Sequence, residues 1–177
     1  ELTGDDKLEA TSGEEVKELT QVNDIGNIVR HKASFDGDAE DKDFKVAFNR
    51  TMDEGAPEST VTLPAPFGIT APEADASFSR ENDDIVITWE NSGTADDMEI
   101  SINGDCIVIW TKKIDGDPGT YTVEKTELDP HDEKETDNCP LTVTLTRLRG
   151  GSLDTGYGEG GSISGQVVRT LDLMSTP

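Results

Sequence analysis

Short stretches in which apolar and polar residues alternate recur along this chain, and they limit its fold more than any other feature. Phe44, Val46 and Phe48 occupy every second position of residues 44–49. Successive side chains of a β-strand point to opposite faces of a sheet, so this period predicts a strand with one buried face. Apolar residues recur similarly in segments 85–89, 98–102, 107–109, 121–123, 141–145 and 167–173. No segment of ten or more residues has the 3.6-residue period of an amphipathic helix, so we expect an all-β protein.

Turn-forming residues lie between these segments and favour a sandwich of antiparallel strands. They occupy residues 91–93, 103–105, 115–119 and 150–152, which are rich in Gly, Asn and Asp. Prolines cluster in residues 64–72, as at a sheet edge or a domain boundary. We therefore expect an acidic, disordered tether over 1–23, a β segment over 24–60 that packs on or extends the sandwich, and a β-sandwich over 61–177.

Composition argues against several classes of partner. The net charge is -23, from 38 acidic and 15 basic residues, and such a surface repels nucleic acid and anionic lipid headgroups. No run of residues approaches the length of a membrane-spanning helix; the most apolar stretch, residues 106–110, predicts a buried strand. Hydrophobic residues make up 32% of the chain, so we expect part of it to stay unpacked.

The two cysteines, Cys106 and Cys139, predict a disulfide. They lack the CxxC spacing of zinc and thioredoxin-type sites, and two buried free thiols are the remaining alternative. Such a bridge would stabilise the fold by roughly 3–4 kcal/mol and indicates an oxidising compartment. Because the sequence starts at Glu1 without Met, we expect a processed chain that is secreted or belongs to a bacterial outer membrane or periplasm, with a lipid anchor upstream as one means of attachment.

Residues 79–93 contain an apolar-x-apolar-x-Trp pattern, formed by Ile85, Ile87 and Trp89. This stretch resembles an early strand of fibronectin type III and related immunoglobulin-like domains. The resemblance spans about residues 61–177, with 97–102 as the next strand and 141–145 with 167–173 as the final hairpin. It implies a sandwich with Trp89 between the sheets. Trp89 precedes both cysteines, so the inter-sheet disulfide of antibody-type domains is not implied. The overall arrangement also resembles secreted or lipid-anchored proteins of marine bacteria.

Catalytic motifs are weak, and we expect a non-enzymatic module. His31 and His131 are the only histidines, no GxSxG motif is present, and the Gly-rich stretch is not followed by a helical pattern. The function we expect is that of a secreted or cell-envelope (lipoprotein) interaction module or spacer with a protein or glycan partner. The alternative is a secreted carbohydrate-active enzyme or its accessory carbohydrate-binding domain, which would need a concave cleft.

Two acidic loops, residues 36–43 and 115–117, are candidate calcium sites because Ca²⁺ prefers clustered oxygen ligands. The EF-hand pattern fails, because an aspartate stands where that motif needs Gly and an alanine where it needs Glu. A hydrated acidic surface is the alternative. The candidate ligands are Asp36, Asp38, Glu40, Asp41, Asp43, Asp115 and Asp117.

Three aromatic residues outside the expected core are candidate ligand contacts: Trp110, Tyr121 and Tyr157. Trp110 is either a second layer of the core or a surface platform. Tyr157 lies in the Gly-rich stretch 150–161, which faintly resembles a calcium-binding nonapeptide repeat and is otherwise expected to be a flexible hairpin loop.

The disulfide can be tested by mass spectrometry of the intact chain. Under denaturing alkylation we expect no added mass before reduction and two alkyl groups after it, because both thiols are bonded. Equal masses before and after reduction would exclude the bridge.

Overall fold

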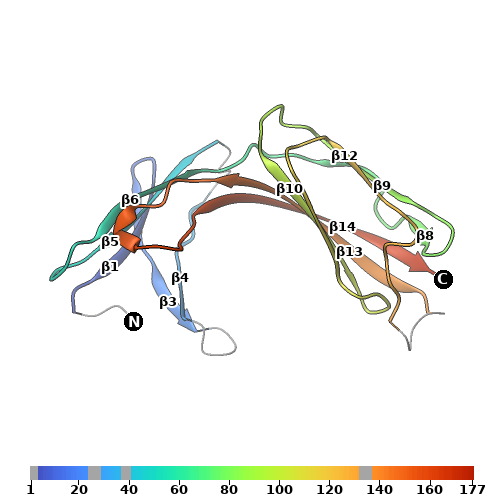
Figure 1. The fold of residues 1–177 in the computed structure, drawn as a ribbon, viewed down its shortest axis with the longest axis horizontal. Coiled ribbons are helices and arrows are strands. Elements are labelled where there is room, and N and C mark those ends of the chain that lie inside the picture. The colour runs from blue at the N-terminus through green and yellow to red at the C-terminus, as the bar shows by residue number, and fades with distance from the viewer. Residues whose placement is uncertain (1–3, 24–28, 37–40, 132–136) are drawn as a thin grey trace. The chain divides into compact units, whose positions relative to one another are not determined.

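The computed structural model describes residues 4–23, 29–36, 41–131 and 137–177, and these form strands with a single short 3-10 helix, η1 (Figure 1). The all-β expectation is therefore confirmed. In this described part of the chain no helix is long and apolar enough to cross a membrane. The chain divides into two compact units: unit 1 comprises residues 1–64 and 149–165, and unit 2 comprises residues 65–148 and 166–177.

Unit 1 contains a four-stranded sheet in the order β2-β1-β5-β6 and a two-stranded sheet, β3-β4. The element bounds are β1 Lys7–Ser12, β2 Glu15–Glu18, β3 Thr20–Asn23, β4 Val29–Lys32, β5 Asp43–Asn49, β6 Ala56–Thr62 and η1 Thr155–Tyr157. Residues 7–23, which we expected to be a disordered tether, thus contain three strands. β1 pairs with β5, which places Leu8 beside Phe48 and Ala10 beside Val46, while β2 pairs with β1 and β3 pairs with β4. A sparse apolar pattern suffices when a neighbouring strand supplies the contacts.

Unit 2 contains a five-stranded sheet, β11-β10-β13-β14-β8, and a three-stranded sheet, β12-β9-β7. The bounds are β7 Ile69–Ala71, β8 Ser77–Ser79, β9 Ile85–Trp89, β10 Asp97–Gly104, β11 Trp110–Ile114 and β12 Thr120–Val123. The hairpin strands β13 (Cys139–Gly150) and β14 (Ser164–Thr176) cross the division between the units. Residues 149–165 therefore belong with the N-terminal strands, whereas we expected 61–177 to form one domain.

The core of unit 2 uses the apolar residues that alternation predicted. Trp89 from the three-stranded sheet and Met98, Ile100 and Leu145 from the five-stranded sheet lie in one buried cluster. Exposures of 0–4% for these side chains confirm the periodicity argument for β9, β10 and β13. Burial of such side chains stabilises a fold by about 1.5–3 kcal/mol each, so this cluster dominates the energetics of unit 2.

Residues 106–110 do not form the continuous buried strand that their composition predicts. Ile107 is buried, but Val108 and Ile109 are 48% and 65% exposed, and β11 begins only at Trp110. A turn closed by the Ile107 N–H on the Gly104 carbonyl takes this segment out of the ladder. The disulfide between Cys106 and Cys139 is present, as predicted, and both cysteines are buried.

A buried ion pair links four segments of unit 2. Arg147 and Asp117 have side chains that are 0% exposed, with 2.8 Å between Nη2 and Oδ2. Trp89 donates its indole N–H to Asp117 Oδ1 at 2.6 Å, and Ser92 donates both its backbone N–H and its hydroxyl to Oδ2 at 2.8 Å. Arg147 also donates to the carbonyl of Ala65 at 2.8 Å. These contacts tie β13 to β9, to the 115–119 turn and to the chain after residue 64.

The electrostatics of Asp117 follow from these contacts. Burial alone would raise its pKa, but hydrogen bonds from Ser92 and Trp89 and the charge of Arg147 lower the pKa below the usual value of 3.8. A group whose folded pKa is lowered stabilises the fold above its unfolded pKa and stops doing so as the pH falls through the folded value. Asp117 therefore stabilises the folded state at neutral pH and loses this effect below about pH 3.8.

We predict that Asp117→Asn lowers the free energy of unfolding of unit 2 by about 3–5 kcal/mol at pH 7, because Arg147 is left buried without its counter-charge. Urea titration followed by tryptophan fluorescence measures this directly, since both tryptophans, Trp89 and Trp110, lie in unit 2. The difference from the parent chain should shrink as the pH falls below 3.8.

The matched control is Asp115→Asn, which removes an exposed carboxylate two residues away and should change stability by less than about 0.5 kcal/mol. Equal effects of the two variants at pH 7 would contradict the role given to the ion pair.

Candidate functional site

The described carboxylates of the acidic loop before β5 do not come together around one point. Asp36, Asp41 and Asp43 are exposed, and Asp38 and Glu40 lie outside the described part of the chain. Asp41 Oδ1 lies 3.6 Å from Nη1 of Arg149, so this carboxylate forms an ion pair. Among the described residues no group of three His, Cys, Asp or Glu side chains could hold a metal ion.

Asp115 and Asp117, the second acidic pair, point to different environments. Asp115 is exposed, whereas both oxygens of Asp117 accept hydrogen bonds from protein donors in the core. Gly116, which lies between them, has a φ of 74°. The turn at this glycine directs the two neighbouring carboxylates into different environments. The structure therefore uses Asp117 to hold unit 2 together.

Trp110 and Tyr121 form an aromatic contact between the edges of the two sheets of unit 2. Their ring centroids are 6.1 Å apart, and both residues are half-buried against the core cluster. The ammonium of Lys112 lies 5.8 Å from the centre of the Tyr121 ring. Trp110 is thus a second layer of the core, one of the two positions that the sequence left open.

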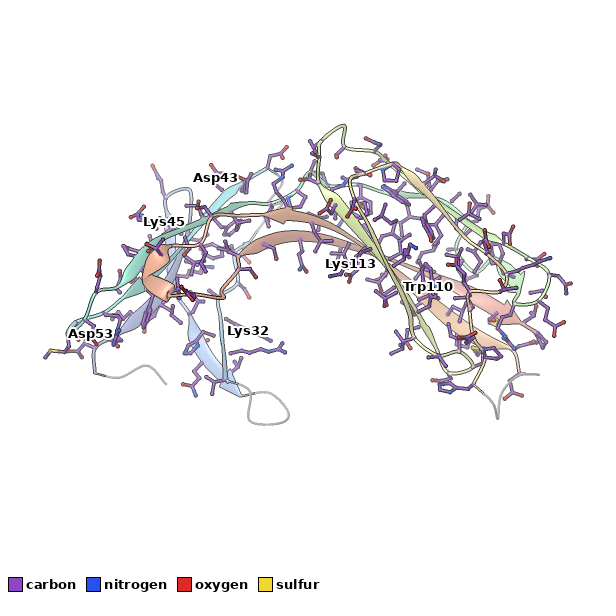
Figure 2. All side chains as sticks on the ribbon, viewed as in Figure 1. Lys32, Asp43, Lys45, Asp53, Trp110 and Lys113 are labelled. Carbon is purple, nitrogen blue, oxygen red and sulfur yellow. A yellow bond between two sulfur atoms is a disulfide. The ribbon has the colours of Figure 1, made fainter. Side chains whose placement is uncertain are left out.

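β11, which carries Trp110 and Lys113 (both labelled in Figure 2), is the last strand of its sheet. Lys112 and Lys113 are exposed in the middle of this strand. Lysines on an edge strand discourage pairing with another strand, because pairing would bury their charges. We interpret β11 as a protected edge.

Tyr157 lies in the loop that joins β13 to β14, and this loop is anchored to β6. The backbones of Thr60 and Ser152 exchange two N–H···O bonds of 2.8 Å each. The Asp154 carboxylate accepts from the Glu58 N–H at 2.7 Å, and the Asp154 N–H donates to the hydroxyl of buried Ser59 at 3.0 Å. These bonds pair the first part of the loop with the outer edge of β6, in place of the flexible hairpin loop that we expected.

Glycines let the loop approach this closely. A Cβ on Gly151 would lie 2.3 Å from the Thr60 carbonyl oxygen, and one on Gly156 would lie 2.4 Å from that of Gly55. Real side chains do not tolerate such distances, so only glycine fits here. The richness in glycine has a packing cause, and the faint resemblance to a calcium-binding repeat is not needed to explain it.

The loop and the sheet beneath it border an open cleft of about 520 Å³ in unit 1, which we call the loop cleft. Register places Val46 of β5 opposite Ser59 of β6, so their side chains share one face and form its floor. The loop supplies the rest of the lining: Leu153, Tyr157, Glu159, Gly160, Gly161, Ser162 and Ile163.

Tyr157 is the best-placed aromatic side chain in this cleft. Its ring stacks on Phe48, with centroids 6.0 Å apart, and the residue is 38% exposed. Burial and the negative charge of Asp154 raise the pKa of its hydroxyl, which therefore stays protonated at neutral pH and can donate a hydrogen bond. Of the three aromatics proposed from the sequence, Tyr157 is the one that lines the loop cleft.

A second groove of about 630 Å³ is formed mainly by the opposite, polar face of the same sheet. Its lining includes Lys45, which Figure 2 labels, together with Thr60 and Arg149. Its cations already have protein partners: Lys45 lies 2.7 Å from Glu58, and Arg149 donates to the Leu63 carbonyl at 3.2 Å. Recruiting these charges for a ligand would break existing bonds. We therefore take the loop cleft as the candidate binding site.

Sequence reasoning named Tyr157 as a candidate contact but did not bring it together with Val46, Ser59, Leu153 and Ile163, which line the same cleft. The available signal was the length of the connection between β13 and β14, since long loops often carry function. The length of this connection does not indicate which strand the loop lies on. No protein-family model matches the sequence, and a search of curated proteins finds no similar one.

We predict that Gly151→Ala weakens the docking of the loop by about 1–3 kcal/mol, because the added Cβ collides with backbone atoms of β6. Hydrogen exchange of the Thr60 and Ser152 amides should show the loss of protection. Gly150→Ala is the control: it adds the same atom one residue earlier, where no heavy atom lies within 4 Å. Similar exchange rates in the two variants would show that close packing does not hold the loop.

Proposed function

We propose that this chain is a non-enzymatic interaction module of a secreted or cell-envelope protein and that it binds its partner in the loop cleft. The observation that carries the proposal is the cleft itself. Its volume of about 520 Å³ falls in the range of ligand sites, and its lining combines apolar side chains with a few polar groups. A half-exposed tyrosine stacked on a second aromatic ring is a rigid contact that loses little entropy on binding.

Two features support a location outside the cytoplasm. The disulfide between buried Cys106 and Cys139 suits an oxidising compartment. The net charge of -23 keeps a chain soluble and suits a salty medium in which carboxylates are screened. For unit 2 we propose an immunoglobulin-like or fibronectin-like sandwich, supported by the position of Trp89 in the cluster that both sheets share.

A carbohydrate-binding accessory domain is the second candidate, because an exposed tyrosine can stack on a sugar ring. Hydrolysis has less support. A glycosidase works with a pair of carboxyl groups across the scissile bond, and in the described lining of the loop cleft Glu159 is the one carboxylate.

Fluorine NMR of the chain labelled with 3-fluorotyrosine tests the proposal. The sequence has two tyrosines: Tyr157 in the loop cleft of unit 1 and Tyr121 beside Trp110 in unit 2. Each candidate surface therefore has its own resonance, assigned with Tyr157→Phe and Tyr121→Phe. With a panel of short peptides and oligosaccharides, we expect at least one class to move the Tyr157 signal and leave the Tyr121 signal in place.

The Tyr121 resonance is the internal control for changes in pH, salt or aggregation. A ligand that moves only the Tyr121 signal would shift the binding site to the aromatic contact of unit 2. A panel that moves neither signal would contradict binding in the loop cleft.

A further inference from the structure

The floor and walls of the loop cleft are predominantly apolar. Val46 points from β5 toward the loop, on the face where Phe44 and Phe48 also lie. Leu153 and Ile163 line the cleft from the two ends of the loop and are only half-buried. Such positions retain apolar surface that a ligand can cover, and each buried CH₂ group contributes about 0.8 kcal/mol.

The described lining of the loop cleft has one charged side chain, and its charge is negative. Glu159 is exposed in the lining, and burial together with the negative charge of Asp154 raises the pKa of the Tyr157 hydroxyl. The chain as a whole carries a net charge of -23. A cationic ligand is therefore attracted to this cleft, whereas an anionic one is repelled.

The tyrosine and the glycines add two further modes of contact. The π face of a tyrosine ring attracts ammonium and guanidinium groups. Gly160 has a φ of 89°, and no heavy atom lies within 4 Å of the place where its Cβ would be. The space beside its Cα is therefore open, and at this point of the cleft lining the backbone of an extended ligand can approach closely.

We infer that the loop cleft binds an extended peptide segment in which an apolar or aromatic side chain is flanked by basic residues. The inference rests on the proposed function and names the class of partner. The apolar side chain would cover Val46, Leu153 and Ile163, and the neighbouring cation would lie between Tyr157 and Glu159. A saccharide fits less well, because it needs several planar polar side chains and the lining offers one carboxylate and two serine hydroxyls.

The test compares three peptides on the full chain by isothermal titration calorimetry. The first is acetyl-Lys-Trp-Lys-Leu-Lys-amide; the second replaces each Lys by Glu; the third replaces Trp and Leu by Ser. We expect the first to bind at least about tenfold more tightly than either of the others, since it alone combines apolar contact with positive charge. Equal affinity of the first and third peptides would overturn the inference, because it would reflect charge alone.

Site variants separate the cleft from general attraction to an acidic surface. Tyr157→Ala should weaken binding of the first peptide by about fivefold or more, and Tyr157→Phe, which keeps the ring, by less than about twofold. Glu159→Gln should weaken it by about two- to fivefold, while Glu81→Gln, at an exposed carboxylate of unit 2, should not. Glu159 is exposed, so this variant leaves the fold intact even where Tyr157→Ala disturbs the packing on Phe48.

The outcomes distinguish this inference from the proposed function. A shift of the Tyr157 fluorine signal by cellohexaose, with none from the first peptide, would overturn the peptide assignment and retain the cleft as a binding site. Equal losses of peptide affinity in Glu159→Gln and Glu81→Gln would also overturn it, since binding would then be spread over the surface.

Discussion

The ion pair between Arg147 and Asp117 holds together the segments on which unit 2 depends. Both side chains are fully buried, and a charge in that position is tolerated only when its partners surround it. Those partners come from β9, the 115–119 turn and the segment after residue 64, so the pair can form only when all of them are in place. Arg147 lies on β13, which continues to Gly150 and leads directly into the glycine-rich loop. The strand that needs the ion pair is thus the strand from which the candidate binding loop begins.

Unit 1 contrasts with unit 2 in how it uses apolar residues. Its buried apolar side chains include small ones such as Ala10 and Ala56, whereas Phe44 and Phe48 stay half-buried. Apolar residues make up only 32% of the chain, and most of the large buried ones lie in the cluster of unit 2. A sheet face that is covered by a loop, and not by a second full layer, retains accessible apolar surface. Because unit 1 has few large buried apolar side chains, the loop cleft retains accessible apolar surface.

How far the sequence could predict these features depended on the distance over which each interaction acts. Strand periodicity correctly located β5, β9, β10 and β13, because alternation is a local property. Asp117 was interpreted as a calcium ligand because its neighbours, Asp115 and Gly116, suit such a loop. Its actual donors lie on Trp89 and Ser92, at least 25 positions away in the sequence, and no local pattern indicates them. Strand β1 was missed for the same reason, since its apolar partners lie on β5.

The sequence by itself determined the all-β class, the disulfide and the acidic surface. Each of these depends on composition or on neighbouring residues: the period of two defines strands, two cysteines allow one intramolecular pairing, and charges add without reference to position. Only the tertiary structure decided which strands pair, which carboxylate is buried, and where the loop after β13 lies. Burial and hydrogen bonding depend on groups that the fold brings together from distant parts of the chain, so Val46, Ser59 and Tyr157 become one cleft only when the loop has docked on β6.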